Sequence, residues 1–170
     1  VYPYEALERL PLVERETRFA LEARGPGYGP EGIGLEFTLD GARSLFVAAT
    51  LASEIILQEY ARQYDLPALI NRFGVVAGPW QLGKVDQGVF THWLLCHHFR
   101  RPLSYIGFGG QGKQVRDLLH VEDVVDLVLA QAARIGEFRG EVFNAGGSTV
   151  ANLSLRETTE LCRQLTGHAV

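Results

Sequence analysis

Methionine, cysteine and lysine are scarce in this sequence of 170 residues, which has no methionine, two cysteines and two lysines. Cys96 and Cys162 are too few and too far apart for a disulfide framework or a C-x-x-C metal site, which predicts a reducing, cytoplasmic environment. Because position 1 is a valine, we expect either that the start was removed or that the chain is a piece of a longer protein.

Long apolar runs are absent as well. No stretch of about 18 consecutive apolar residues indicates a membrane span, and the opening VYPYEALERL lacks the charged-then-apolar layout of an export signal. Positive charge is in deficit, with 16 lysines and arginines against 20 acidic residues and a formal net charge of -4. This balance creates no field that would attract nucleic acid or anionic lipid, so we expect neither as a partner.

Proline and glycine crowd the first 40 residues, which predicts a loop-rich entry with short strands. Neither residue type interrupts 43–64, where apolar residues follow the 3.6-residue period of a helix. Glu54, Gln58 and Arg62 gather on one side of this segment, and the rest of it is largely apolar. The pattern predicts a long helix that is buried against more than one neighbour.

Further along the chain, helical and extended patterns alternate, which is typical of α/β proteins. The expected strands are 67–73, 103–108 and 141–147, and the expected helices are 89–100 and 121–134. A capping box of Ser154 and Glu157 predicts a last helix, which Gly167 should end.

The segment GFGGQGKQ, residues 107–114, matches two phosphate-binding patterns, G-x-G-x-x-G and G-x-x-x-x-G-K. Both require the loop to open a helix, whereas the VRDLLHV that follows alternates like an extended segment. Gln114 also stands where a P-loop has Ser or Thr. We expect a surface turn or a substrate-facing loop. The P-loop alternative predicts Mg²⁺-dependent ATP binding that is lost when Lys113 is changed.

Three histidines, His92, His97 and His98, fall within two helical turns. Their spacing places them on different helix faces, unlike the i, i+4 pair that chelates a metal. We therefore expect a helix surface and no metal. His120 lies between apolar residues, which predicts a hydrogen-bonded core histidine.

Gln87, Lys113 and Arg116 offer hydrogen-bond donors near predicted glycine turns. The forked guanidinium of an arginine suits a pyrophosphate. The alternative for Arg116 is a salt bridge with Asp117 or Asp123. Residue spacing alone does not decide between pyrophosphate binding and a salt bridge.

The strings VDQGVF, GKQVRDLLHVEDVV and EVFNAGGSTVANLSL together resemble the C-terminal half of extended short-chain dehydrogenase/reductases that act on nucleotide sugars, in particular the NAD-dependent 2-epimerase type. The resemblance implies the C-terminal half of a doubly wound, Rossmann-like α/β fold plus a small sugar-nucleotide-binding domain. Residues 1–80 would be the remaining part of the NAD-binding domain and 81–170 mainly the substrate domain, with 116–147 returning to the sheet. A homodimer through helix 43–64 is also implied, as is a cofactor-binding half, upstream or on a separate chain.

In such enzymes the long helix carries a tyrosine and, four residues later, a lysine that tunes the tyrosine for proton transfer. The matching positions here are Phe46 and Thr50, which have no phenol proton and no positive charge. The glycine-rich NAD loop of the family is also missing from this chain. The resemblance therefore implies NAD as the family's cofactor and none for this chain alone.

Carried onto this sequence, the resemblance implies that Gln87, Tyr105, Lys113 and Arg116 bind a CDP- or UDP-sugar. Arg116 would hold the pyrophosphate, and Tyr105 would lie near the base or ribose. One hypothesis is therefore a part of a nucleotide-sugar epimerase with weak or absent activity on its own. The alternative is a non-catalytic subunit that binds a nucleotide sugar or serves as a dimerising scaffold.

Overall fold

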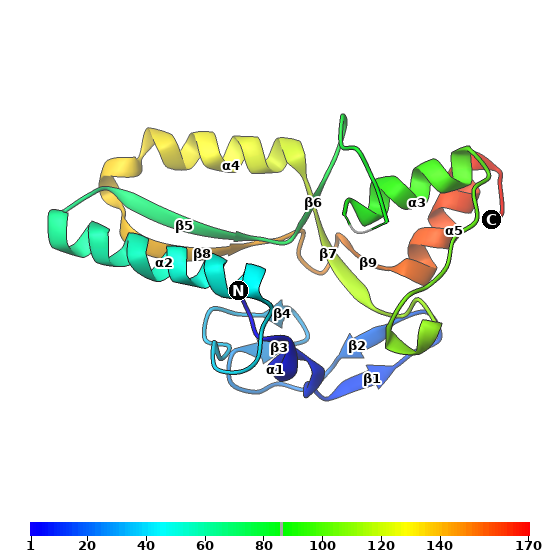
Figure 1. Cartoon of the computed structure of the whole chain (residues 1–170), viewed down its shortest axis with the longest axis horizontal. Coiled ribbons are helices and arrows are strands. Elements are labelled where there is room, and N and C mark those ends of the chain that lie inside the picture. The colour runs from blue at the N-terminus through cyan, green and yellow to red at the C-terminus, as the bar shows by residue number, and fades with distance from the viewer. Residues whose placement is uncertain (86) are drawn as a thin grey trace. The chain divides into compact units, whose positions relative to one another are not determined.

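The computed structural model describes residues 1–85 and 87–170 and confirms the α/β class (Figure 1). The helices are α1 (Tyr4–Glu8), α2 (Leu45–Tyr64), α3 (Val89–His98), α4 (Val121–Ala133) and α5 (Leu155–Thr166), with 3-10 turns η1 (Phe108–Gly110) and η2 (Ile135–Glu137). The strands are β1 (Leu12–Glu14), β2 (Phe19–Leu21), β3 (Tyr28–Gly29), β4 (Gly32–Ile33), β5 (Ala68–Phe73), β6 (Val75–Ala77), β7 (Val115–His120), β8 (Arg139–Ala145) and β9 (Asn152–Ser154). Among the described residues, no helix is long and apolar enough to cross a membrane.

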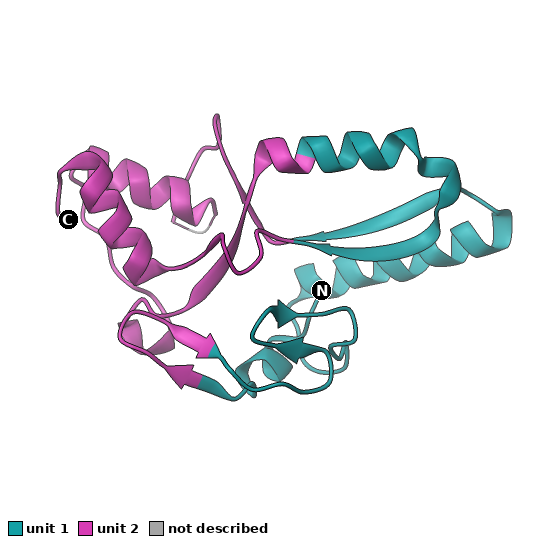
Figure 2. Cartoon of the chain, turned by 180° about the vertical axis from the view of Figure 1, so that it is seen from behind, with its two compact units in different colours: residues 1–12, 21–73, 125–145 teal, residues 13–20, 74–124, 146–170 magenta. Residues whose placement is uncertain are grey.

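The chain forms two compact units, each assembled from separate stretches of sequence (Figure 2). Unit 1 comprises Val1–Leu12, Leu21–Phe73 and Val125–Ala145. Unit 2 comprises Val13–Ala20, Gly74–Val124 and Gly146–Val170. The functional division near residue 80 stays a prediction.

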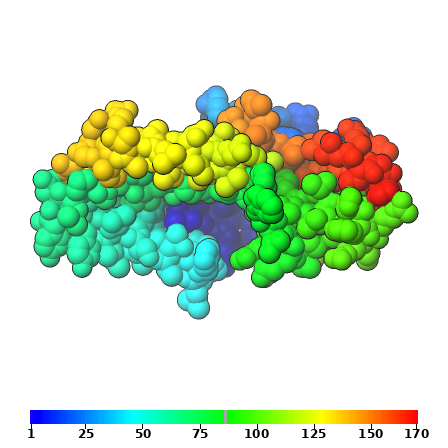
Figure 3. Space-filling model, turned by 90° about the horizontal axis from the view of Figure 1, so that it is seen from above, coloured from blue at the N-terminus to red at the C-terminus, as the bar shows by residue number. Residues whose placement is uncertain are grey.

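Unit 1 is built on two parallel strands, β5 and β8, in a register that places Ile70 opposite Val142 and Phe73 opposite Ala145. Helix α2 packs on one face of this pair, and residues of α4 cover the other (Figure 1). Asn71 of β5 and Gln131 of α4 exchange side-chain hydrogen bonds of 2.7 and 3.0 Å. The space-filling view shows the atoms of α4 lying along those of α2 and β5 (Figure 3).

Helix α2 has almost the predicted bounds, because both of its ends carry clear signals. The Ser44 side chain caps it by accepting a hydrogen bond from the Val47 N–H, and Asp65 ends it in the left-handed conformation at φ 50°. Two residues of its polar stripe face inward: Glu54 is buried, and Gln58 donates to the carbonyl oxygen of Gly140 at 3.2 Å. Arg62 is exposed and forms a surface ion pair with Glu59. The exposed surface of the helix carries many large apolar side chains, namely Leu45, Phe46, Ile55, Ile56, Leu57, Tyr60 and Tyr64.

Unit 2 contains a sheet in the order β6-β7-β9, with β6 parallel and β9 antiparallel to β7. Helices α3 and α5 pack together beside it through a cluster of Trp93, Leu155 and Cys162. The capping box that opens α5 is present as predicted, and Gly167 ends the helix at φ 72°.

The strand expected at 103–108 is not formed, and this prediction was wrong. Leu103 and Tyr105 pack one-sidedly against the Trp93 cluster, so their alternation reflects burial without strand pairing. Gly107 and Gly109 then turn the chain at positive φ values of 75° and 72°, a backbone conformation that interrupts a strand.

Candidate functional site

Phe46 and Thr50 lie one turn apart on α2, so helical spacing places them on the same face, as the family pattern requires. The Phe46 side chain is 81% exposed. The Thr50 hydroxyl donates to the carbonyl oxygen of Phe46 at 3.0 Å. A phenyl ring and a hydroxyl already engaged by the backbone supply neither a proton donor nor a cation. The pair therefore does not fit the proton-transfer role beside NAD.

A hollow of about 380 Å³ lies next to Thr50 in unit 1. It is lined by Val1, Thr50, Ser53, Glu54, Leu57, Leu69, Ile70, Asn71, Arg72 and Phe73. One wall carries a buried ion pair in which the Arg72 guanidinium donates to the Glu54 carboxylate at 2.7 and 3.1 Å. Tyr2 adds to this network, since its hydroxyl accepts from Arg72 at 3.1 Å and donates to the Asn144 side chain at 2.9 Å.

Burial by itself would lower the pKa of Arg72, but its hydrogen bonds with Glu54 and Tyr2 outweigh that effect and raise the pKa. Sequence reasoning missed this network. The available signal was Arg72 within the apolar run PALINRF, because a charge in a buried strand requires a partner.

Arg116 lies on β7 and is half-buried. Its guanidinium donates from Nη1 to the carbonyl oxygen of Val115 at 3.2 Å, and no carboxylate among the described residues pairs with it. Burial lowers the pKa of Arg116. The alternative salt bridge with Asp117 is not formed, because Asp117 Oδ1 accepts the Gly147 N–H at 2.8 Å instead. A half-buried cation without a counter-ion can accept an anion.

Lys113 is already engaged: its ammonium group donates to the Glu14 carboxylate at 2.6 Å, and its side chain is 11% exposed. The segment 107–114 leads into strand β7, not into a helix. It therefore lacks the helix N-terminus that a nucleotide loop needs, and the P-loop alternative is wrong.

Gln87 is exposed in the loop that leads into α3. Its backbone exchanges hydrogen bonds with Lys84, at 2.8 and 3.2 Å. This pairing holds the backbone of Gln87 and leaves its side chain at the surface.

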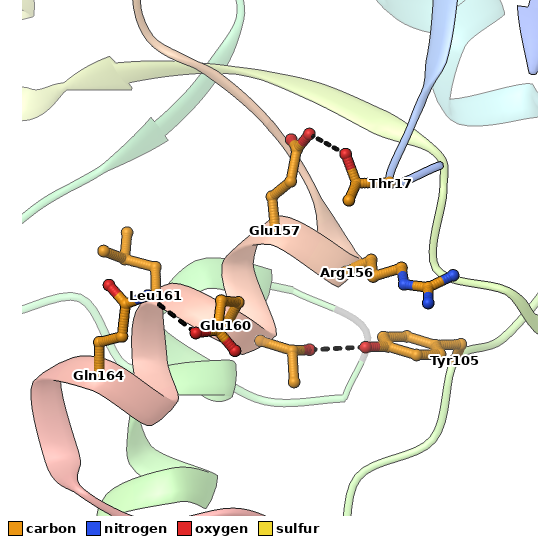
Figure 4. Close-up of a pocket in the computed structure, with 8 residues that line it drawn as sticks. Thr17, Tyr105, Arg156, Glu157, Glu160, Leu161 and Gln164 are labelled. Carbon is orange, nitrogen blue, oxygen red and sulfur yellow. Dashed lines mark hydrogen bonds between the residues drawn. The ribbon is translucent and has the colours of Figure 1, made fainter. Parts of the chain in front are cut away.

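Tyr105 lines a second hollow, of about 530 Å³, in unit 2 (Figure 4). Its ring stacks on Trp93 with centroids 6.1 Å apart, and its hydroxyl is 2.8 Å from Oγ1 of Thr159. Gly112 lies close against another part of the ring, because a Cβ atom at this position would be 2.6 Å from Cε1 of Tyr105. Because ring and hydroxyl are both engaged within the protein, Tyr105 acts as a packing residue here.

The histidines of α3 have separate environments. His97 is fully buried, with Nδ1 2.8 Å from the carbonyl oxygen of Trp93, while His98 packs edge-on against Phe99. Within the described residues, no group of three or more His, Cys, Asp or Glu side chains could hold a metal ion. His120 is exposed and accepts the Glu122 N–H at 3.3 Å, so its predicted core position was wrong.

The predicted site residues fall into both compact units. Phe46 and Thr50 belong to unit 1, and Gln87, Tyr105, Lys113 and Arg116 belong to unit 2. In unit 2, the start of β7 brings Lys113 and Arg116 into one segment, and Tyr105 contacts the preceding Gly112. Gln87 belongs to a different loop.

The model of the family described as "NAD dependent epimerase/dehydratase family" matches residues 26–146. Among curated proteins, the CDP-paratose 2-epimerase of Salmonella typhi is 31% identical over 164 residues, which cover 93% of this chain and 46% of the relative. The chain thus spans less than half the length of that relative.

Solved structures of the same kind are also similar. A UDP-glucose 4-epimerase from Thermotoga maritima, solved with UDP-glucose, is 26% identical at a TM-score of 0.63, over 75% of this chain and 39% of that one. A dTDP-glucose 4,6-dehydratase from Bacillus anthracis, solved with NAD, is 23% identical at a TM-score of 0.69, over 88% and 43% of the two chains, and supports the fold alone. On the family match and these relatives, the chain belongs to the NAD dependent epimerase/dehydratase family.

Proposed function

We propose that this chain is the sugar-nucleotide-binding part of an NAD-dependent nucleotide-sugar epimerase of the 2-epimerase type, with weak or absent proton transfer. Its similarity to CDP-paratose 2-epimerase supports the reaction class. A CDP- or UDP-sugar is the proposed ligand, and the cofactor would be held by a further part of the fold.

The observation that carries this proposal is the half-buried guanidinium of Arg116, which has no carboxylate partner among the described residues. Burying a cation without compensation costs free energy, and a bound anion removes that cost. A pyrophosphate matches the forked donors of arginine. Arg116 therefore holds the diphosphate of the ligand.

The other predicted contacts have more limited roles. Gln87 contributes an exposed amide. Lys113 reaches a ligand only by leaving Glu14, since the two are paired at 2.6 Å. Tyr105 keeps the loop before β7 in place through its contacts with Trp93 and Gly112.

Isothermal titration of the chain with CDP-glucose and UDP-glucose tests the proposal. We expect binding, and for Arg116→Gln a loss of affinity of at least about 30-fold, because breaking a buried charge pair costs about 2 kcal/mol or more. Arg163→Gln is the control, since Arg163 forms an exposed ion pair with Glu160. No heat with either nucleotide sugar, or unchanged binding by Arg116→Gln, overturns the proposal.

A second candidate is a non-catalytic scaffold that dimerises through α2. The apolar outer face of that helix favours it, as does the stacked pair of Tyr60 and Tyr64, with ring centroids 5.5 Å apart. Under this alternative, the assembled protein binds a nucleotide sugar without turnover.

A further inference from the structure

His168, just beyond the end of α5, bridges two groups at the end of α3. Its Nδ1 atom lies 3.1 Å from the carbonyl oxygen of His97, and its Nε2 atom lies 2.9 Å from Nη2 of Arg100. All three residues belong to unit 2, in which α3 and α5 pack side by side (Figure 1). The bridge therefore joins the ends of the two helices.

The two partners fix the protonation of the His168 ring. A carbonyl oxygen only accepts hydrogen bonds, so Nδ1 carries the proton. A guanidinium only donates, so Nε2 is an unprotonated acceptor. The bridge thus exists only for the neutral ring with its proton on Nδ1. A second proton, on Nε2, would remove the acceptor and place an imidazolium against the guanidinium of Arg100.

His97 imposes the same requirement. Its side chain is fully buried, and its Nδ1 atom, 2.8 Å from the carbonyl oxygen of Trp93, carries the proton for the same reason. Its Nε2 atom is buried without a hydrogen-bond partner among the described residues. Protonation would turn that nitrogen into a buried N–H donor without an acceptor, which costs free energy. Both histidines therefore support the packed ends of α3 and α5 only while they are neutral.

The backbone of Arg100 adds a second observation at this place. Arg100 follows Phe99, the C-cap of α3, and has a positive φ of 54°. Glycine is the usual residue in this conformation at a helix end, because a side chain disfavours it. The hydrogen bond from Arg100 to His168 offsets part of that cost. Loss of the bond in acid would leave the strain uncompensated.

The surroundings offer no counter-charge for a protonated ring. Residues 87–116, which include α3 and the turn after it, contain no aspartate or glutamate, and neither do residues 167–170. Within residues 1–85 and 87–170, no carboxylate forms an ion pair with Arg100 or His168. The other titratable or charged groups on α3 and the turn after it are His92, Cys96, His98 and Arg101. Protonation would therefore add charge to a cluster that is already cationic.

Helix α5 does not supply an anion either. Its two carboxylates are engaged elsewhere, Glu157 with Arg18 and Glu160 with Arg163. Cys162 belongs to the cluster between α5 and α3, and burial raises the pKa of its thiol to about 11. The thiol is therefore neutral at any pH at which a histidine titrates.

We infer that His97, Arg100 and His168 form a pH-sensitive clasp between the ends of α3 and α5, closed while both histidines are neutral and open in mild acid. Histidine side chains ordinarily take up a proton near about pH 6.5. The closed form binds fewer protons than the open form, so its stability is fully present above this range and is lost as the pH falls through it. The clasp goes beyond the proposed function, because none of its three residues takes part in nucleotide-sugar binding.

Hydrogen exchange of the 170-residue chain at about pH 7.5 and about pH 5.5, corrected for the pH dependence of intrinsic exchange, tests the clasp. An open state that binds one more proton gains up to about tenfold in population for each pH unit. We therefore expect the opening equilibrium of peptides covering 96–101 and 162–168 to rise about tenfold in acid. Peptides covering β5 and β8, in unit 1, should change far less.

The variant His168→Gln separates the proton from the contacts. A glutamine amide can donate to the His97 carbonyl and accept from Arg100, but it does not titrate. We expect this variant to keep its protection at neutral pH and to lose most of the rise in acid. His98→Gln is the matched control, because His98 is an exposed histidine of the same helix outside the clasp. It should show the full rise.

The ring nitrogens allow a measurement that needs no variant. Long-range ¹H–¹⁵N NMR spectra distinguish a neutral imidazole that is protonated on Nδ1 from one that is protonated on Nε2. We expect the Nδ1 form for both His97 and His168 at neutral pH.

Three results overturn the clasp. One is a neutral His168 ring protonated on Nε2, which could not accept from Arg100. Another is an equal rise in acid for His168→Gln and the unmodified chain. The third is a folded chain whose peptides 96–101 and 162–168 exchange alike at both pH values. Nucleotide-sugar binding at Arg116 is measured separately by calorimetry at neutral pH, so failure of one proposal leaves the other standing.

Discussion

The hydroxyl group of Thr50 donates a hydrogen bond to the backbone carbonyl of Phe46, one helical turn earlier, at 3.0 Å. This bond satisfies the only polar group that the two side chains offer. On the predicted match of these positions to the family's tyrosine and lysine, the pair keeps the one-turn spacing and offers neither a phenol proton nor a positive charge.

Restoring both groups should restore proton transfer. In a protein that also contains a cofactor half, we expect Phe46→Tyr with Thr50→Lys to raise the rate of sugar epimerisation by about 10² to 10⁴ over the unmodified chain, the typical contribution of a positioned acid/base. Product formation is followed by chromatography of the nucleotide sugars.

The single variants should each recover much less, because the lysine acts through the tyrosine. Ser53→Lys controls for an added charge on the same helix. An unmodified assembly that is already as active as the double variant would contradict the argument.

Stability should fall in acid because of Glu157. Burial by itself would raise the pKa of Glu157, but hydrogen bonds from Arg18, the Ser154 N–H and Thr17 outweigh it and lower the pKa from 4.5 to about 2. A lowered pKa stabilises the fold above pH 4.5, and this contribution is lost as the pH falls from 4.5 to about 2. The loss should be on the order of 3 kcal/mol at most.

Urea unfolding at pH 7 and pH 3 measures this effect, and Glu157→Gln should weaken the fold at pH 7 and flatten the pH dependence. Glu160→Gln is the matched control. The pKa of Glu160 is also about 2, through hydrogen bonds from Arg163 and Gln164, but the pair with Arg163 is exposed and should contribute little. Equal effects of Glu157→Gln and Glu160→Gln on the free energy of unfolding would contradict the stabilising role assigned to Glu157.

Gly146 should not tolerate a side chain. A Cβ there would lie 1.7 Å from Oδ2 of Asp117, so Gly146→Ala should lower the free energy of unfolding by roughly 1 to 3 kcal/mol, the usual cost of overpacking. Adding Asp117→Ala should recover part of this loss. Gly136→Ala meets nothing within 4 Å and should change stability by less than about 0.5 kcal/mol. The denaturant midpoints of the unmodified chain, the two single glycine variants and the double variant measure these changes in stability.

The outer face of α2 should mediate a homodimer. Ile56 is exposed on that face, and placing an arginine there would leave a charge in an apolar interface. We expect light scattering to show a dimer for the unmodified chain and a monomer for Ile56→Arg, with Leu129→Arg as the surface control. A monomeric unmodified chain would exclude this interface.

The elements that sequence patterns predicted well are those with local causes. Helix α2 and the capping box of Ser154 and Glu157 were expected and are present, because periodicity and capping act within a few residues. The strand expected at 103–108 failed, since a strand needs a partner and these residues found a packing surface instead.

In the candidate site, too, some features follow from the local sequence and others only from the tertiary structure. The sequence by itself determined the family likeness, the one-turn spacing of Phe46 and Thr50, and the absence of a phenol and an amine at those positions. Only the tertiary structure decided that Glu54 pairs with Arg72, that Lys113 pairs with Glu14, and that Arg116 has no acidic partner among the described residues. The reason is physical: the free energy of a charge depends on its burial and on which distant groups the fold brings near, and neither is encoded in local spacing.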